Sequence, residues 1–308
     1  MNRLSDYSRM LVAMDLTKMD ESVVSYASVI ARAFNFDSVY FLHVTTSLEL
    51  PQEIHEKYGD MMAPVDETLE TEMNQTIKEF FDAPDACDVK VHVATGNITN
   101  EVLKYSKVKM VDLILLGRKA ELTGSGLHSK KIAKSASASI LFVPEKPILK
   151  LEKLLIPIDY SKYSEMAFML GVDIQKHFGC KLLSNHVYRV PTGYYKSGKT
   201  YEEFADIMLE NTKKDCDRFF SNMELDGVDY EHTYALDDDP HPADKIYRTA
   251  VEEKADMIVL GSKGRSGAIS MLIGSVAERL VMEDNDIPLL LVKKRDENIG
   301  LLEALFRI

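Results

Sequence analysis

The sequence repeats itself at a nearly constant spacing, and this duplication restricts the folds that the chain can adopt. Asp15 recurs as Asp159 and Gly117 recurs as Gly261, each 144 positions later. A His-Val pair recurs 143 positions later, beginning at His186. The matching segments are 10–15 with 154–159, 41–44 with 184–187, 111–117 with 255–261 and 140–144 with 288–292. Several matches in the same order indicate two copies of one structural unit.

Short apolar runs alternate with segments of helical period in each half. In the second half the apolar runs are 153–158, 181–187, 256–260 and 288–293, with a further strand expected near 228–235. The segments expected to be helices are 161–178, 201–223, 243–254 and 275–283, the first with Ser161 as N-cap. Apolar runs flanked by helices are typical of parallel strands covered on both faces. We therefore expect an α/β fold of two tandem, doubly wound, five-stranded parallel-sheet domains of Rossmann-like type.

The position of the linker predicts the domain boundary. The charged stretch 145–153 contains Pro147 and predicts domains 1–147 and 148–308.

The charge and the cysteines indicate which partners and which compartment suit the chain. The formal net charge of −12 argues against general binding to nucleic acids or anionic membranes. Three widely spaced cysteines without a C-x-x-C pair are typical of reduced thiols. Since neither a signal peptide nor an apolar run of bilayer-spanning length is recognisable, we expect a cytoplasmic protein.

A glycine-rich loop in the second half gives the clearest indication of function. Gly261-Ser262-Lys263-Gly264 follows the apolar run 257–260, and after nine further residues Gly274-Ser275 begins a helical segment. Glycine lets a backbone approach an anion closely, and N–H groups before a helix N-terminus form a cradle for phosphate. In an open α/β sheet this loop would lie beside Asp159 and Val187, which close two other strands. A carboxylate, an apolar wall and a glycine loop together suit a purine nucleotide.

The side chains around this loop have recognisable tasks in such a site. Asp159 can accept a hydrogen bond either from the amino group of adenine or from a ribose hydroxyl, and Val187 can pack on the base. The Ser275 hydroxyl and the cations of Lys263 and Arg265 would assist the loop in binding phosphates.

These motifs, in this order, resemble the universal stress protein family, and the duplication resembles its tandem-domain members. The resemblance covers nearly the whole chain and implies an adenine nucleotide alpha hydrolase-like fold. It also implies a site for ATP, with or without Mg²⁺, as in the ATP-binding branch of the family. The matching positions are Pro157, Ile158, Asp159, Val187, Leu260, Gly261, Gly264, Gly274, Ser275 and Val276.

The resemblance further implies how the two halves associate. In single-domain members of the family the final strands pair across a dimer. Here Ile140–Val143 and Pro288–Val292 are expected to pair within one chain as an intramolecular pseudo-dimer, which would cover two sheet edges. A further homodimer of two chains and the identity of any protein partner are left open.

The first half departs from the nucleotide motif. Ala120 occupies the second glycine position, and Lys130-Lys131 replaces the Gly-Ser pair. A methyl group and a long side chain in the cradle favour a degenerate loop without nucleotide. The alternative is that Arg118, Lys119 and the lysine pair concentrate positive charge where a phosphate would lie.

Simpler structural roles compete with several of these assignments. The three loop glycines would also suit a tight strand-to-helix turn without a ligand, and for Asp15 an N-cap role is preferred. His43 and His186 are expected to be hydrogen-bonded core residues. The run 237–239 is expected to be solvated rather than to bind a metal ion. Four tyrosines of residues 188–201 either cover the base or form a partner surface, and an amphipathic tail, 298–308, is expected to dock on its own domain.

Three functions remain open at this point. The first is an ATP-binding regulatory protein of the stress response, with the nucleotide in the second half. The second is an ATPase, of which at most slow turnover is expected, because the sequence has no Walker A motif, kinase signature, nucleophile elbow or HExxH, and no catalytic residue is assigned. The third is a nucleotide-free scaffold that acts through protein contacts.

Overall fold

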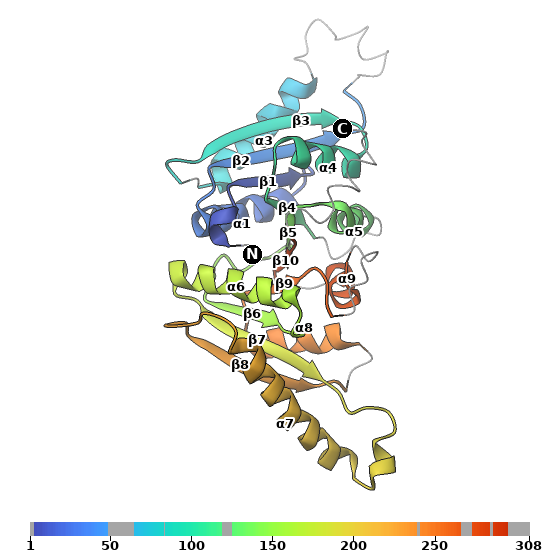
Figure 1. Ribbon diagram of the computed structural model, residues 1–308. Helices are drawn as coiled ribbons and strands as arrows, with labels where there is room; N and C mark the ends of the chain where they lie inside the picture. Colours follow the sequence, from blue (N-terminus) through green and yellow to red (C-terminus); the bar gives the residue numbers. More distant parts are fainter. Residues whose placement is uncertain are drawn as a thin grey trace, which may run out of the picture. The chain divides into compact units, whose positions relative to one another are not determined.

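The computed structural model describes residues 3–48, 65–82, 84–118, 125–238, 241–265, 273–283 and 286–294. The chain divides into two compact units, whose main parts are Ser5–Leu149 and Lys150–Lys294. Each unit is an α/β domain with its own core (Figure 1). None of the helices in these described ranges is long and apolar enough to cross a membrane.

The N-terminal unit has a parallel sheet in the order β3-β2-β1-β4-β5. The middle strand β1 is apolar on both faces, and Met10, Leu11 and Val12 are fully buried because helices pack on either side. The elements are η1 (Leu4–Asp6), β1 (Arg9–Met14), α1 (Met19–Phe34), β2 (Ser38–Thr45), α3 (Val65–Phe80), β3 (Asp88–Thr95), α4 (Ile98–Val108), β4 (Leu113–Gly117), α5 (Ser125–Ser135) and β5 (Ser139–Val143).

The C-terminal unit repeats this arrangement, with a parallel sheet in the order β8-β7-β6-β9-β10. The elements are β6 (Lys153–Pro157), α6 (Lys162–Phe178), β7 (Lys181–Tyr188), η3 (Tyr194–Ser197), α7 (Tyr201–Phe220), β8 (Tyr230–Leu236), α8 (Pro242–Glu252), β9 (Met257–Gly261), α9 (Ser275–Met282) and β10 (Leu289–Val292). The five strands and four helices expected here are confirmed, with ends that agree within three residues. The doubly wound α/β fold is therefore also confirmed for each half.

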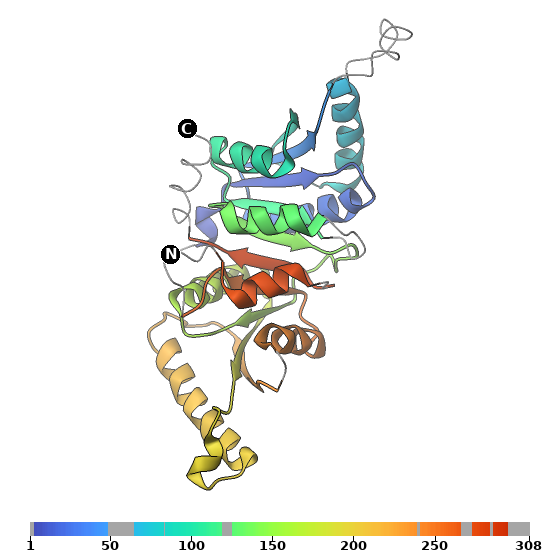
Figure 2. The ribbon, with the colours of Figure 1, turned by 90° about the vertical axis from the view of Figure 1, so that its right-hand side faces the viewer.

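Local sequence signals fix the ends of the helices in the C-terminal unit. The Ser161 side chain accepts a hydrogen bond from the Ser164 N–H at 3.2 Å, which confirms the predicted N-cap of α6. Gly179 ends the same helix in the left-handed conformation, with φ of 69°. Thr200 and Glu203 form a capping box at the start of α7. Helices α6 and α7 cover one face of the sheet, and α8 and α9 cover the other (Figure 2).

The strand order reverses between β6 and β9, and this reversal positions the site. The chain proceeds from β6 through β7 to β8 and then returns to place β9 on the opposite side of β6. The carboxyl ends of these strands therefore diverge at one edge of the sheet, where ligands bind in open α/β folds. Asp159, Val187 and Gly261 lie at the ends of β6, β7 and β9 respectively.

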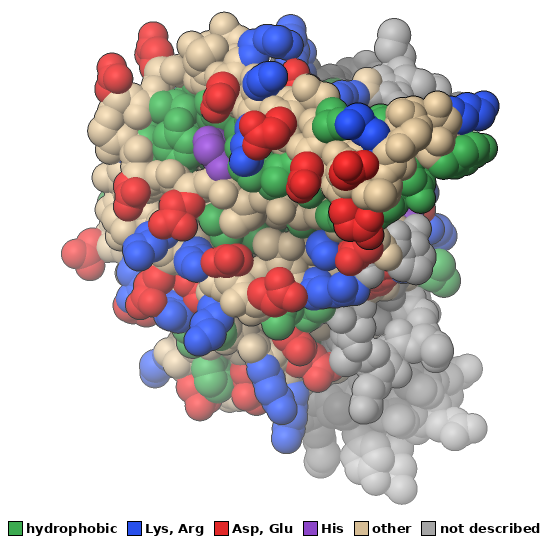
Figure 3. Space-filling view, turned by 90° about the horizontal axis from the view of Figure 1, so that it is seen from below, with side chains coloured by type: hydrophobic (Ala, Val, Ile, Leu, Met, Phe, Trp, Pro, Cys, Tyr) green, Lys and Arg blue, Asp and Glu red, His purple; other side chains and the backbone are tan. Residues whose placement is uncertain are grey.

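Charged side chains of both signs are mixed over the face drawn in Figure 3, which is seen from below relative to Figure 1. Lys and Arg side chains alternate there with Asp and Glu side chains, so the described part of this face has no continuous basic area. A phosphate backbone would require such an area for non-specific binding.

Candidate functional site

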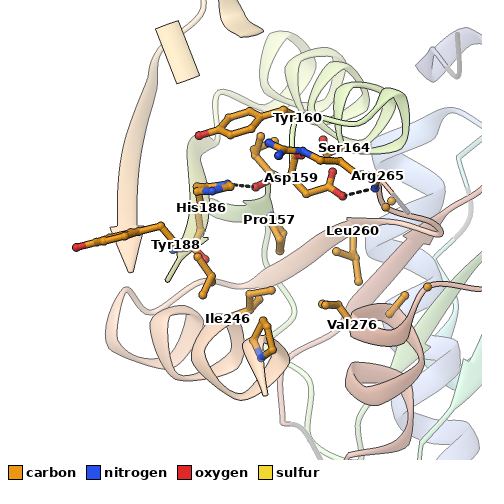
Figure 4. A pocket seen from close by; sticks show the side chains of 18 of the residues that line it. Pro157, Asp159, Tyr160, Ser164, His186, Tyr188, Ile246, Leu260, Arg265 and Val276 are labelled. Carbon is orange, nitrogen blue, oxygen red and sulfur yellow. Dashed lines mark hydrogen bonds between the residues drawn. The ribbon is translucent and has the colours of Figure 1, made fainter. Parts of the chain in front are cut away.

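A pocket of about 510 Å³ opens at the carboxyl ends of β6, β7 and β9, beside the N-terminus of α9 (Figure 4). Its volume lies within the range of pockets that hold small ligands. The ten motif positions all line this pocket: Pro157, Ile158, Asp159, Val187, Leu260, Gly261, Gly264, Gly274, Ser275 and Val276. The fold thus brings together residues that are more than 100 positions apart in the sequence.

Asp159 joins two loops at the mouth of the pocket. Its Oδ1 accepts a hydrogen bond from the Ser161 N–H at 3.0 Å, and its Oδ2 accepts one from the Arg265 N–H at 3.0 Å. The first bond stabilises the turn between β6 and α6, and the second fixes the loop after β9. Each carboxylate oxygen accepts one of these bonds and retains a further lone pair for a ligand.

Close packing explains two of the three loop glycines. A Cβ at Gly261 would lie 2.6 Å from the backbone carbonyl oxygen of Tyr163, and a Cβ at Gly264 would lie 2.6 Å from Oδ2 of Asp159. Gly274 is different, because the nearest atoms to a Cβ would be 3.5 Å away and its φ of −73° suits any residue. The protein itself therefore does not require glycine at Gly274, where the absent side chain leaves room at the pocket wall.

The first turn of α9 offers backbone donors to an anion. Gly274 is the N-cap of this helix and, being a glycine, has no side chain that could cap it. The first N–H groups of a helix have no partner inside the helix, so Ser275 and Val276 present donors at the pocket wall. The Gly274 N–H donates instead to the Ser262 carbonyl at 2.8 Å. Lys263 also lines the pocket, and burial lowers the pKa of its ammonium group.

Arg265 lies against Tyr160 instead of extending toward the α9 end of the pocket. Its guanidinium carbon is 4.8 Å from the centre of the Tyr160 ring, and its Nε donates to the backbone carbonyl of Asp159. Figure 4 shows the side chain directed toward Tyr160. This cation–π contact differs from the phosphate contact expected from the sequence.

Tyr160 and His186 form an aromatic layer beside the pocket. Their ring centres are 4.5 Å apart, and the Tyr160 hydroxyl donates to the Thr212 carbonyl of α7 at 3.1 Å. The His186 Nδ1 is 2.6 Å from the Ile158 carbonyl, to which its N–H donates. Burial lowers the pKa of His186 and so favours the neutral ring. His43 makes the equivalent 3.0 Å contact with the Met14 carbonyl in the N-terminal unit, so both histidines have the expected hydrogen bond, and His186 also lines the pocket.

The sequence did not single out the part of the pocket that comes from α7 and α8. Helix α7 contributes Met208, Thr212 and Asp215, and α8 contributes Pro242 and Ile246. Helical period identifies the apolar side of a helix, but it does not indicate beside which strand end that side will lie. Further lining residues without a sequence signal are Tyr160, Ser164, Asn185, Arg189 and Ala277.

The tyrosines after β7 do not act as one group. Tyr188 lines the pocket. Tyr194 packs edge-to-face on Tyr195 and Tyr201, with ring centres 6.1 Å and 5.5 Å apart. Of these four tyrosines, Tyr188 is therefore the one that could cover a base in the pocket.

The expectation that the acidic run 237–239 is simply solvated is wrong for Asp237, whose side chain is buried in an ion pair. Asp237 pairs with Arg189 at 2.7 Å, and Asp238 pairs with Lys245 at 2.9 Å. Asp239 lies outside the described residues, as does the tail 298–308. Within the described ranges, no group of three or more His, Cys, Asp or Glu side chains could hold a metal ion.

The N-cap role expected for Asp15 in the N-terminal unit is wrong. Asp15 is not an N-cap, because α1 begins at Met19 and Lys18 precedes it. Its carboxylate instead accepts a 2.6 Å hydrogen bond from the Thr17 hydroxyl. The cause is the left-handed Leu16, with φ of 57°, which turns the chain before the helix starts. Lys130 and Lys131 lie in α5, whereas Lys119 and Ala120 are outside the described residues.

The fold and the pocket define a pair of doubly wound domains, of which the C-terminal one has a pocket at its strand switch point, beside the N-terminus of α9. The profile of the Universal stress protein family matches residues 6–144 and 150–293, and the chain belongs to this family.

Individual relatives agree with this assignment. The chain is 32% identical over 144 residues to Universal stress protein MJ0531 of Methanocaldococcus jannaschii, covering 46% of this chain and 82% of that protein. It is 32% identical over 149 residues to Universal stress protein YxiE of Bacillus subtilis, covering 46% and 98%. The fold is similar to the crystal structure of a universal stress protein from Archaeoglobus fulgidus, with a TM-score of 0.61, 18% identity and coverage of 93% and 98%.

Proposed function

We propose that the C-terminal half binds ATP in the pocket between β6, β7, β9 and α9, and that its occupancy regulates the partners of the protein in a cytoplasmic stress response. The observation that carries this proposal is that the ten motif positions line one pocket of about 510 Å³. Membership of the universal stress protein family supports it, because the same positions match the motif of the ATP-binding branch.

The chemistry of the walls suggests how a nucleotide would lie. The N–H groups of Ser275 and Val276 and the ammonium group of Lys263 would hold the phosphates at the α9 end. The apolar side chains of Val187 and Ile246 would pack on the base at the other end. Asp159 lies between them and has acceptor capacity for a ribose hydroxyl.

A regulatory role is favoured over efficient hydrolysis. Phosphoryl transfer requires a positioned base, a metal clamp and stabilisation of charge at the transferring group. The His186 N–H donates to the Ile158 carbonyl, and two backbone N–H groups fix the Asp159 carboxylate, whose remaining lone pairs suit binding of a ribose hydroxyl better than activation of a water molecule. Mg²⁺ would be held mainly by the phosphates themselves. A slow ATPase and a nucleotide-free scaffold are the alternatives that the experiment must separate.

Calorimetric titration of the full chain with ATP, with and without Mg²⁺, tests this proposal. Gly274→Lys introduces the residue found at the matching position Lys130, and it should abolish saturable binding. Lys130→Ala is the matched control and should leave binding unchanged. A wild-type protein that binds no ATP would favour the scaffold, and phosphate release from Mg-ATP that disappears in Gly274→Lys would favour the ATPase.

A further inference from the structure

An ion pair joins the two helices that border the pocket on one face of the sheet. Arg279 of α9 donates two hydrogen bonds to Asp244 of α8, from Nε to Oδ1 at 2.8 Å and from Nη2 to Oδ2 at 3.0 Å. Such a bidentate pair fixes the direction of both side chains, because the planar guanidinium matches the carboxylate. The hydrogen bonds from Arg279 lower the pKa of Asp244, so the pair is charged at neutral pH. Glu283 at the end of α9 also contacts Arg279, at 2.7 Å, and holds it from a second side.

The two linked helices supply opposite ends of the proposed nucleotide site. Helix α8 supplies Ile246, on which the base would pack, and α9 supplies Ser275 and Val276, whose N–H groups would hold the phosphates (Figure 4). Asp244 lies two residues before Ile246, and Arg279 lies four residues after Ser275. The pocket lining includes neither side chain of the ion pair. The pair can therefore act on the pocket through the placement of the two helices.

The first half has no counterpart of this ion pair. Helices α4 and α8 begin 144 residues apart, and the same spacing places the neutral residues Asn100 and Ser135 at the two positions of the pair. Helices α4 and α5 are linked instead by a 2.8 Å hydrogen bond between the Thr99 hydroxyl and the His128 ring. The fold can therefore join these helices without a charged fork. The fork occurs in the half that carries the complete glycine motif.

Building on the proposed function, we propose that the Arg279–Asp244 pair is a positioning element, which holds the first turn of α9 at the distance from the α8 wall that a nucleotide spans. A ligand that contacts both walls benefits from this preorganisation, because it does not have to order α9 itself. A ligand that contacts the α8 wall alone gains nothing from it. The pair should therefore favour ATP over adenosine, although neither of its side chains touches the ligand.

The ratio of ATP affinity to adenosine affinity, measured by calorimetric titration of the full chain, tests this inference. Asp244→Asn removes the charged fork and should lower the ratio by about threefold to fivefold, the factor that corresponds to the coupling of a well-ordered ion pair. The adenosine affinity itself should not change. A merely structural role would reduce both affinities by the same factor, and an unchanged ratio in a variant that folds would overturn the inference.

A second variant separates positioning from the attraction between charges. Arg279→Met removes a cation, whereas Asp244→Asn removes an anion. Long-range attraction of the phosphates alone would therefore lower ATP affinity in Arg279→Met and raise it in Asp244→Asn. Positioning lowers the ratio of ATP affinity to adenosine affinity in both variants. A ratio that rises in Asp244→Asn would overturn the inference.

The matched control removes an ion pair of the same helix at the opposite end of the sheet. Glu253, the C-cap of α8, pairs with Lys153 at the start of β6 at 3.1 Å, far from the carboxyl end where the pocket opens. Glu253→Gln should keep the wild-type ratio, and an equal fall there would overturn the inference. If the wild-type chain does not bind ATP, the proposed function fails together with the inference. If it binds ATP and Asp244→Asn keeps the wild-type ratio, the inference alone is wrong.

Discussion

Substitution of Gly274 by aspartate separates the stability of the protein from its ability to bind a nucleotide. Gly274 is the N-cap of α9, with φ of −73° and ψ of 154°, and a Cβ there would have no atom closer than 3.5 Å. Aspartate is among the preferred N-cap residues because its carboxylate accepts hydrogen bonds from the first-turn N–H groups. These are the donors that we assign to the phosphates. The new side chain would therefore stabilise the helix and occupy the site.

The two effects have opposite signs and different sizes. A cap and a negative charge at a helix N-terminus should raise the free energy of unfolding by about 0.5 kcal/mol. Repulsion between one carboxylate and one phosphate charge about 5 Å apart is about 3 kcal/mol at an effective dielectric constant near 20. This corresponds to roughly a hundredfold loss of ATP affinity, in addition to the loss of the backbone donors.

Calorimetric titration with ATP and urea unfolding of the nucleotide-free protein would measure both effects. Gly274→Asn has a similar shape and cap without the charge, so it should lose about tenfold in affinity through the occupied donors alone. Gly274→Ala provides neither cap nor charge. If Gly274→Asp folds with wild-type stability or better and still binds ATP as the wild type does, phosphates do not lie at the start of α9.

Other parts of the C-terminal unit give predictions that need no ligand. Gly261→Ala should lower the free energy of unfolding by about 1–3 kcal/mol, since its Cβ would overlap the Tyr163 backbone, and unchanged urea unfolding would contradict the packing argument. Tyr160→Phe removes the bond to the α7 carbonyl and should cost about 0.5–1.5 kcal/mol in the same assay. Burial lowers the pKa values of His186 in β7 and of His232 in β8 below the ordinary value of 6.5, so the unfolded chain binds more protons than the folded one. Stability should therefore fall as the pH decreases below about 6.5, and replacing both histidines by asparagine should flatten the change in the urea midpoint between pH 7.5 and 5.5.

The fold was predictable because its determinants are local and occur twice. Apolar runs and helical segments of the second half reproduce the observed elements within three residues. The duplication also explains residues with purely structural roles. Asp112 accepts 2.9 Å hydrogen bonds from the Ser8 and Arg9 N–H groups at the start of β1. Asp256 accepts the equivalent bond from the Lys153 N–H at the start of β6. In both copies this carboxylate therefore stabilises the start of the first strand of the unit.

Only those pocket residues that belong to a short sequence motif were predictable. Asp159 and the glycines occur at strand ends, and the rule that ligands bind at the switch point brings them together. Met208 and Thr212 of α7 reach the same pocket through the path of a helix that begins after η3, and no spacing in the sequence encodes that path. The sequence also contained no indication that Tyr160 is left-handed, with φ of 63°, because residues other than glycine seldom adopt this conformation.

Comparison of the two copies distinguishes residues required by the fold from residues available for function. The turn after the first strand is left-handed in both halves, and both histidines of the repeated pair donate to a carbonyl of that strand or the residue after it. The copies differ at Gly274 and Asn185, where the first half has Lys130 and Leu42. Packing does not demand a glycine at Gly274, and both Gly274 and Asn185 line the pocket. The proposed function accounts for the difference at Gly274, because a lysine side chain at this position would fill the end of the pocket where we propose that the phosphates lie.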